Sequence, residues 1–150
     1  MEQTLVLIKP DGIQRGLAGT ILGRFEQRGL IIVALKMIHM DKPLAKRHYR
    51  IHEGKPFFND LVSYITSSPI IAMVLEGPSA VDVTRRTMGE TNSGNAAPGT
   101  IRGDFAITIE QNLVHGSDSV ENAKNEINLL FEKEEIISYS KDADKWIIES

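Results

Sequence analysis

The sequence predicts an α+β fold in which one four-stranded antiparallel sheet packs against helices. The chain has 150 residues, 41% of them hydrophobic and 25% charged, which suits one globular domain with a sizeable core. Gly and Pro divide it into short segments whose apolar periodicity follows the order strand, helix, strand, two helices, strand, helix, strand. No repeat, linker or low-complexity tract interrupts this order, so we expect a single domain over residues 1–150.

The first half of the chain is predicted to contain two strands and three helices. The strands are apolar runs rich in β-branched residues, and the first is ended by Pro10-Asp11-Gly12. The first helix carries apolar residues at helical spacing and ends at Gly29, whereas Asp41 and Pro56 mark the starts of the next two helices. In chain order we expect Thr4–Lys9, Gly16–Arg28, Leu30–Met40, a helix from Asp41 through His48, and Phe57–Thr66.

The second half is predicted to contain two strands, two helices and a polar tail. Gly77-Pro78 closes the third strand, and Ser119 is typical of a helix start. The last helix should bury Val120, Ala123, Ile127, Leu130 and Phe131. We expect a strand at Ile70–Leu75, a helix at Ser79–Met88, a loop at Gly89–Thr100, a strand at Phe105–Ile109, and a tail at 132–150 anchored by Ile136, Tyr139, Trp146 and Ile147.

Strands separated by helices fit either parallel βαβ units or a split βαβ arrangement with an antiparallel sheet. Four short strands with one layer of helices suit 150 residues better than a doubly wound sheet covered on both faces. We therefore predict the ferredoxin-like α/β sandwich with split βαβ topology.

Composition excludes several classes of function. The formal net charge of −3 and a pI near 5.8 give no general attraction to nucleic acid, so anion binding requires a local basic site. The absence of cysteine excludes disulfides, thiolate metal sites and cysteine nucleophiles. The N-terminus lacks a basic leader, and no apolar run approaches the ~20 residues of a membrane span. We expect a cytoplasmic protein without membrane contact.

The common nucleotide and hydrolase fingerprints are absent, so the chemistry must be found elsewhere. His115 lies between a strand end and a helix start, a place that favours phosphate. Glu126 can accept a proton from one imidazole nitrogen and leave the other as nucleophile, with Ser117 bracing the carboxylate. The alternative is a turn histidine, a capping serine and a solvated glutamate.

Basic residues suggest a phosphate site. Arg85, Arg86 and Arg102 flank the Gly-rich loop that contains Thr91, and together they suit a polyphosphate, although paired arginines on a helix are more often simply solvated. No other feature of the sequence supports a phosphate-binding role for Arg86. Lys9 ends a buried strand, where an ammonium needs an anionic or hydroxyl partner.

A protein-held metal ion is not predicted. His48 and His52 are four residues apart and Glu53 follows, but H-E-x-x-H is absent and Gly54 and Pro56 break the helix before a third ligand.

Several segments together resemble the nucleoside diphosphate kinase family, in the right order over nearly the whole chain. The segment around His115 is the most specific of them. The segments are Lys9-Pro10-Asp11-Gly12, His48-Tyr49 through Gly54-Lys55-Pro56-Phe57-Phe58, Gly89-Glu90-Thr91-Asn92, Pro98 to Phe105, and Asn112-Leu113-Val114-His115-Gly116-Ser117-Asp118-Ser119.

The resemblance implies ping-pong transfer of the γ-phosphoryl group from a nucleoside triphosphate to a diphosphate, with His115 as the phosphorylated nucleophile oriented by Glu126 and Ser117. It also implies Mg²⁺ that arrives with the nucleotide and a homo-oligomer, hexameric or tetrameric. One departure is Ser93, where the family usually has proline. The nucleotide site implied by motif position comprises Lys9, Tyr49, Phe57, Arg85, Thr91, Arg102 and Asn112.

Two other classes stay open from the residues alone. Arg102-Gly103-Asp104-Phe105-Ala106-Ile107 is similar to an RNA-binding strand motif, but Asp104 stands where a base-stacking aromatic residue is needed. An inactive scaffolding relative should have lost His115, Arg102 or Lys9, and all three are present. We therefore predict an enzyme without specific nucleic-acid binding.

Overall fold

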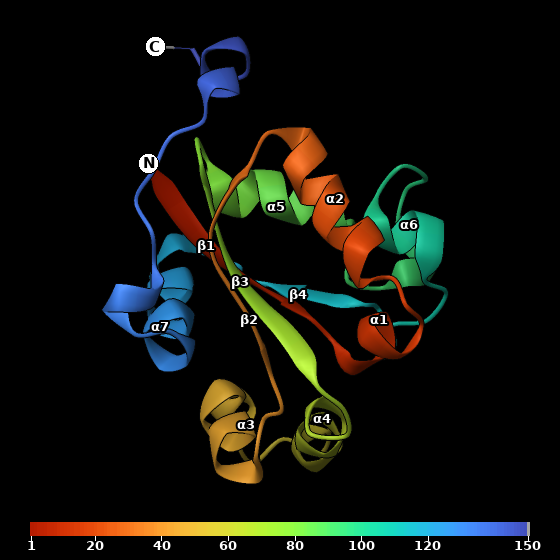
Figure 1. The fold of residues 1–150 in the computed structure, drawn as a ribbon. Coiled ribbons are helices and arrows are strands. Elements are labelled where there is room, and N and C mark those ends of the chain that lie inside the picture. Colours follow the sequence, from red (N-terminus) through yellow and green to blue (C-terminus); the bar gives the residue numbers. More distant parts are fainter. Residues whose placement is uncertain (150) are drawn as a thin grey trace.

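A four-stranded antiparallel sheet forms the centre of the molecule (Figure 1). The computed structural model describes residues 1–149. The sheet order is β2-β3-β1-β4, with β1 paired to both β3 and β4, and β3 also paired to β2. This order confirms the predicted ferredoxin-like, split βαβ topology. The strands are β1 (Glu2–Ile8), β2 (Ile31–Ile38), β3 (Ile70–Gly77) and β4 (Val114–Gly116).

Helices cover both faces of the sheet, so the predicted single layer of helices is wrong. The reason lies in β1, where Leu5 and Leu7 enter one apolar cluster while Val6 and Ile8 enter the other. A central strand that is apolar on both faces must be covered on both. One face packs against α1 (Pro10–Gln14), α2 (Ala18–Arg28), α5 (Ala80–Met88) and α6 (Ile101–Phe105), and the other against α3 (Lys42–His48), α4 (Phe58–Ile65) and α7 (Val120–Leu130).

The predicted fourth strand is also wrong. Phe105 ends α6, which begins where Thr100 accepts a hydrogen bond from the Gly103 N–H at 3.0 Å. Beyond it, Ile107 and Ile109 are 84% and 50% exposed and join no strand. The observed strand β4 comes five residues later and pairs with β1, so that His115 lies opposite Leu7. Three residues are too few to show strand periodicity, which is why the sequence pattern pointed to the longer apolar run.

The tail after α7 is only partly anchored as predicted. Ile136 packs against the core, the Tyr139 hydroxyl donates to the Ile32 carbonyl, and an Ile147 methyl lies over Gly29. Trp146 is 83% exposed, so its predicted anchoring role is wrong within this chain. Two 3-10 turns, η3 (Lys133–Glu135) and η4 (Asp142–Trp146), shape the segment, and Ser150 lies outside the described residues.

We predict that Gly103→Ala destabilises the protein, because a Cβ there would lie 1.9 Å from the Ala97 carbonyl oxygen and the obstacle is backbone. The free energy of unfolding should fall by about 2–4 kcal/mol. Gly19→Ala on exposed α2 is the control, since nothing lies within 4 Å of its Cβ; there the change should stay below about 1 kcal/mol and be stabilising. Urea unfolding followed by circular dichroism measures both, and equal values would contradict the prediction.

Candidate active site

The helix α7 supplies the side chain that orients His115 in β4. Ser119 caps α7 by accepting a hydrogen bond from the Asn122 N–H at 3.0 Å, and this turn directs the helix back along the sheet. Glu126 then meets the histidine, with Nε2 of His115 2.5 Å from Oε1 of Glu126. The buried Ser117 hydroxyl donates to the other carboxylate oxygen at 2.5 Å. Both oxygens of Glu126 are therefore engaged.

The electrostatics of this triad select one imidazole nitrogen. Burial opposes ionisation of Glu126, but the hydrogen bonds from His115 and Ser117 outweigh it and hold the pKa of the carboxyl below its usual value. The charged carboxylate accepts the N–H of Nε2, which leaves the lone pair on Nδ1. Within residues 1–149, Nδ1 of His115 has no hydrogen-bond partner. Nδ1 is thus the nitrogen available to react.

A line of rings runs from His115 to the exposed Phe57. His48 stands edge-on to His115 with ring centroids 5.0 Å apart, and Tyr49 lies 4.6 Å from His48. His52 follows at 6.4 Å from Tyr49 and 5.4 Å from Phe57. The end of α3, the 3-10 turn η1 (Arg50–His52) and the turn before α4 supply these residues. Phe57 is 45% exposed, so part of its ring is free to stack on a ligand.

Lys9, just after β1, and Asn112, shortly before β4, form a polar pair. Lys9 Nζ donates to Asn112 Oδ1 at 2.7 Å and to the Glu110 carbonyl at 3.2 Å. Asn112 in turn donates to the Thr91 carbonyl at 3.0 Å. Burial lowers the pKa of Lys9 to about 8, and the charge of Asp11 opposes part of that shift. The ammonium is therefore largely charged at neutral pH and ready to bind an anion or hydroxyl.

Arg102 connects the loops around the site. The buried guanidinium remains charged, since burial lowers its pKa only to about 10. Three of its five N–H groups are used and two remain. Arg85 lies close by and donates to the Gly116 carbonyl at 3.1 Å. The carbonyls that accept from Arg102 belong to Gly89, Asn112 and Val114, at 2.9, 3.1 and 2.6 Å.

Hydrogen bonds and ring contacts link Glu126, Ser117, Tyr49 and Phe57 to His115. Lys9, Thr91, Arg102 and Asn112 form a second hydrogen-bonded group, and Arg85 donates to the carbonyl of Gly116, the residue after His115. Two further residues had no role assigned from sequence. His48 contacts His115, and Asp11 Oδ2 accepts the Leu113 N–H at 3.0 Å, which fixes the entry to β4 where Leu113 has φ 73°. Both lie within the family motifs, the only sequence signal that pointed to them. Ser93 is buried in η2 (Ser93–Asn95), and its hydroxyl has no partner within residues 1–149.

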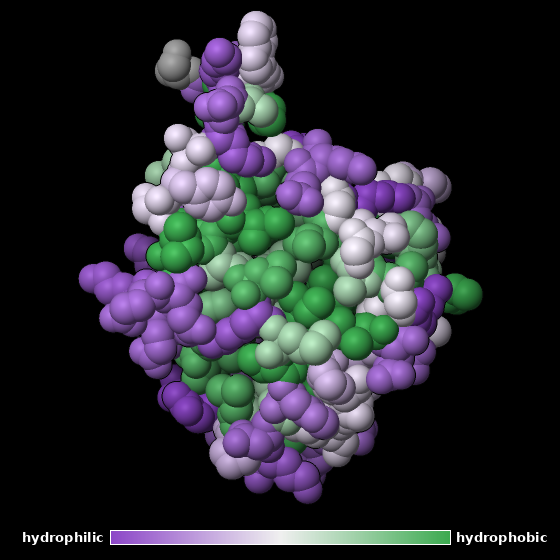
Figure 2. All heavy atoms as spheres, in the orientation of Figure 1, coloured by the Kyte–Doolittle hydropathy of each residue, from purple (hydrophilic) through white to green (hydrophobic). Residues whose placement is uncertain are grey.

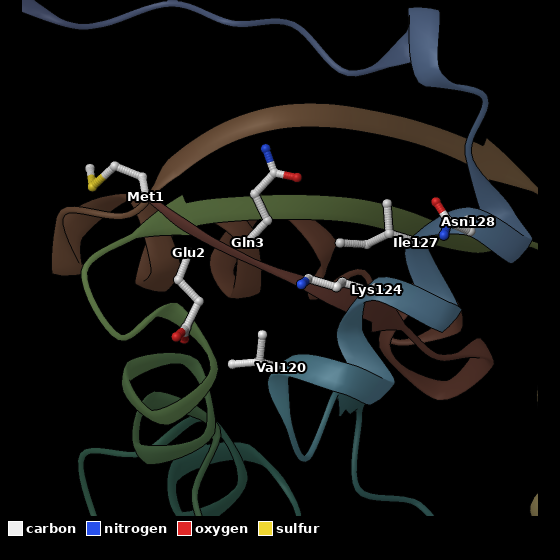
Figure 3. A pocket seen from close by; sticks show the side chains of 7 residues that line it. All are labelled: Met1, Glu2, Gln3, Val120, Lys124, Ile127 and Asn128. Atoms are coloured by element: carbon white, nitrogen blue, oxygen red, sulfur yellow. The ribbon is translucent and has the colours of Figure 1, made fainter.

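One hollow lies apart from the predicted site residues. It has a volume of about 600 Å³ and lies between the start of β1 and α7, where the side chains of Glu2 and Lys124 face it (Figure 3). It contains none of the ten predicted residues. A second hollow of about 340 Å³ lies beside Asp11, Tyr64 and Gln111. His115, whose side chain is 30% exposed, lines neither of these hollows.

Comparison with known proteins decides the family. A family profile described as nucleoside diphosphate kinase matches residues 2–136. The chain belongs to the nucleoside diphosphate kinase family. The nucleoside diphosphate kinases of Thermomicrobium roseum and Roseiflexus castenholzii are 53% and 54% identical to it, over 99% of this chain and 99% and 100% of theirs. The halophilic nucleoside diphosphate kinase of Halobacterium salinarum, solved in complex with CDP, superposes with a TM-score of 0.95 at 47% identity, covering 99% of both chains.

As a nucleoside diphosphate kinase, the chain is a phosphotransferase. It moves the γ-phosphoryl group of a nucleoside triphosphate to a nucleoside diphosphate by a ping-pong mechanism with a phosphohistidine intermediate. The RNA-binding alternative fails on structure, because its strand motif falls on α6 and the loop after it. No helix in residues 1–149 is long and apolar enough to cross a membrane.

We predict that Arg102→Lys destabilises the enzyme by about 3 kcal/mol, because a lysine cannot reproduce three fixed hydrogen bonds to separate carbonyls. Arg86→Lys is the matched control, since Arg86 pairs only with Asp82 on the surface and should change stability by less than about 0.5 kcal/mol. Urea unfolding measures both variants. Equal stability of Arg102→Lys and wild type would show that the three contacts do not organise the loops.

Proposed function

We propose that Nδ1 of His115 carries the phosphoryl group between the two nucleotides of this kinase. The observation that carries the proposal is the hydrogen bond from Nε2 to Glu126, which leaves the Nδ1 lone pair free. In the first half-reaction that lone pair attacks the γ-phosphorus. The bond from phosphorus to the bridging oxygen breaks, and its electron pair leaves with the nucleoside diphosphate. In the second, a terminal oxygen of the incoming diphosphate attacks the phosphorus and releases Nδ1.

Glu126 and Ser117 act as positioning residues in this proposal. The imidazole gains positive charge as Nδ1 bonds to phosphorus, and the nearby carboxylate stabilises that charge. Ser117 holds the second oxygen of Glu126, so the carboxylate cannot rotate away. Because these contacts exist before substrate arrives, little reorganisation is required at the moment of transfer.

The remaining predicted residues are proposed to bind the nucleotide. Lys9 and Asn112 form a hydrogen-bonded pair suited to the ribose hydroxyls, and Phe57 offers a ring face to any base. Tyr49 keeps its proton, because burial raises the pKa of its hydroxyl to about 12, so it donates to a phosphate. Cationic and hydroxyl groups proposed for the phosphates are Arg85, Thr91 and the two unused N–H groups of Arg102.

Mg²⁺ is proposed to enter as part of the nucleotide substrate. It takes oxygen ligands in octahedral geometry and is commonly held through substrate phosphates. The residues proposed for the phosphates fit this arrangement, because Lys9, Arg85 and Arg102 are cationic and offer no oxygen ligands to the ion. Asp118 accepts a hydrogen bond from Asn122 and can hold at most a water of the ion. Bound in this way, the ion neutralises charge on the phosphates.

A homo-oligomer, hexameric or tetrameric, is proposed as the working assembly. β2 is an edge strand that pairs with no strand other than β3 among the described residues, although the tail donates hydrogen bonds to its Ile32 and Val33 carbonyls. Leu35 and Met37 on β2 are exposed. Apolar side chains gather over the middle of the face across which β2 and β3 run (Figure 2). Exposed apolar edges of this kind are normally covered by another chain. The exposed Trp146 is a second apolar group that a neighbouring subunit would bury.

Labelling tests the role of His115 directly. The enzyme incubated with ATP labelled at the γ-phosphate should carry an acid-labile, base-stable label on His115, and should convert GDP to GTP when Mg²⁺ is present. His115→Ala should take up no label. Label that persists in this variant, or peptide mapping that places it on Ser117, would overturn the assignment.

We predict that Glu126→Gln slows phosphorylation of His115 by about a hundredfold without abolishing it, because the amide orients the ring but carries no charge. Glu121→Gln is the control, since Glu121 is exposed on the same helix. Single-turnover phosphorylation by ATP measures both rates, and circular dichroism verifies that both variants are folded. An unchanged rate in Glu126→Gln would show that the carboxylate takes no part.

A further inference from the structure

Three side chains at the active site form a set with the chemistry of metal ligands. One potential ligand atom from each of His48, His115 and Glu126 lies within 4.8 Å of the other two. The three residues come from α3, β4 and α7, so only the fold brings them together. Two imidazoles and one carboxylate are the protein ligands of many open zinc sites, in which a water or substrate takes the fourth position. The proposed phosphoryl transfer through Nδ1 of His115 assigns no role to His48.

His48 is the unusual member of this set. Both of its ring nitrogens are buried, and neither has a hydrogen-bond partner within residues 1–149. Buried polar groups normally have partners, so an imidazole with two unsatisfied nitrogens requires an explanation. Its ring stands edge-on to His115 at 82°, with centroids 5.0 Å apart. An unpaired nitrogen so close to another imidazole and a carboxylate is what a metal ligand presents before the ion binds.

We propose that His48, His115 and Glu126 bind a divalent transition-metal ion, with Zn²⁺ as the probe, in the nucleotide-free enzyme. Zinc holds nitrogen and carboxylate ligands at roughly 2.0–2.2 Å, so the ligand atoms of a tetrahedral site lie about 3.4 Å apart. The separation of 2.5 Å between Nε2 of His115 and Oε1 of Glu126 must therefore lengthen, and separations of up to 4.8 Å elsewhere in the set must shorten. His48 is the ligand that can move, because no hydrogen bond restrains its ring. Glu126 supplies the negative charge.

Neither His52 as a ligand nor Mg²⁺ as the bound ion fits this set of side chains. His52 is outside it, despite its spacing from His48, and its Nδ1 lies 3.3 Å from Lys55 Nζ, whose charge disfavours a cation. Mg²⁺ is not expected to bind there, since it requires oxygen ligands in octahedral geometry and two of the three groups offer nitrogen. The site should therefore separate Zn²⁺ from the ion that accompanies the nucleotide.

The consequence of such a site is inhibition. An ion held by Glu126 and by Nε2 of His115 replaces the N–H that Glu126 orients. Its positive charge makes the lone pair on Nδ1 less able to attack phosphorus. This consequence rests on the proposed role of His115, whereas binding of the ion itself does not. The two are measured separately below.

Calorimetric titration of the nucleotide-free enzyme with ZnCl₂ tests the binding. We expect one saturable Zn²⁺ per chain in wild type and none with MgCl₂. His48→Phe keeps an aromatic ring in place and should weaken Zn²⁺ by at least the roughly tenfold to hundredfold seen when a supporting group is lost. His52→Phe is the matched control and should bind Zn²⁺ as wild type does. Absence of saturable binding in wild type, or equal affinity in His48→Phe, would overturn the proposal.

NMR of the wild-type enzyme tests the same site without relying on the folding of His48→Phe. The chain has four histidines, and Zn²⁺ should shift the ring NMR signals of His48 and His115 in the wild-type enzyme. His39 should not move, because its Nε2 lies 2.8 Å from the Thr66 carbonyl and is engaged there. Shifts confined to His39 or His52 would place the ion elsewhere and overturn the site.

Phosphorylation distinguishes the two proposals. If His115→Ala still takes up label while Zn²⁺ binding depends on His48, the role of His115 in transfer fails and the metal site stands. If labelling requires His115 and Zn²⁺ binds equally to wild type and His48→Phe, the metal site alone fails.

Discussion

The hydrogen bond between Glu126 and His115 is the contact on which the chemistry of this protein depends. It joins the edge strand β4 to α7, fixes the protonated nitrogen of the imidazole, and places a negative charge where the ring becomes positive. A solvated carboxylate would gain little from such a bond, because water competes for both partners. Partial burial, together with the second bond from Ser117, makes the arrangement specific.

Buried cations organise the rest of the site. Lys9 and Arg102 are both charged groups with little exposure to water, and each donates hydrogen bonds to oxygens of other segments of the chain. Burial lowers the pKa of each, yet leaves both cationic at neutral pH. Removing a charge from water is costly unless its hydrogen bonds are replaced. The loops are therefore held in the positions that satisfy these charges, close to where a polyphosphate would bind.

Family membership explains why the activity was predictable, and the geometry explains why these residues suit it. Transfer through an enzyme-bound phosphoryl group requires one free nucleophile beside concentrated positive charge, and the structure brings both to one open surface. The same concentration of donors around His115 creates the cluster with His48. The imidazole and the carboxylate that prepare Nδ1 for phosphorus are also ligand types that transition-metal ions prefer.

The sequence alone determined the elements with strong periodicity and the residues within distinctive motifs. The strand near Thr4–Lys9, the helix after Ser119, and the group around His115 follow from local patterns that need no partner. The local sequence pattern could not predict β4, because these three residues form a strand only through their pairing with β1. It could not show that β1 is covered on both faces, or that Trp146 is 83% exposed among residues 1–149.

Only the tertiary structure decided which nitrogen of His115 is free and what lies beside it. Both depend on the direction in which α7 leaves its cap and on where α3 packs, and these are set by burial of apolar faces from the whole chain. Spacing in sequence placed His48 next to His52, whereas packing placed it against His115. Residues distant along the chain meet because the two sides of the sheet must be covered, and no local signal records that contact.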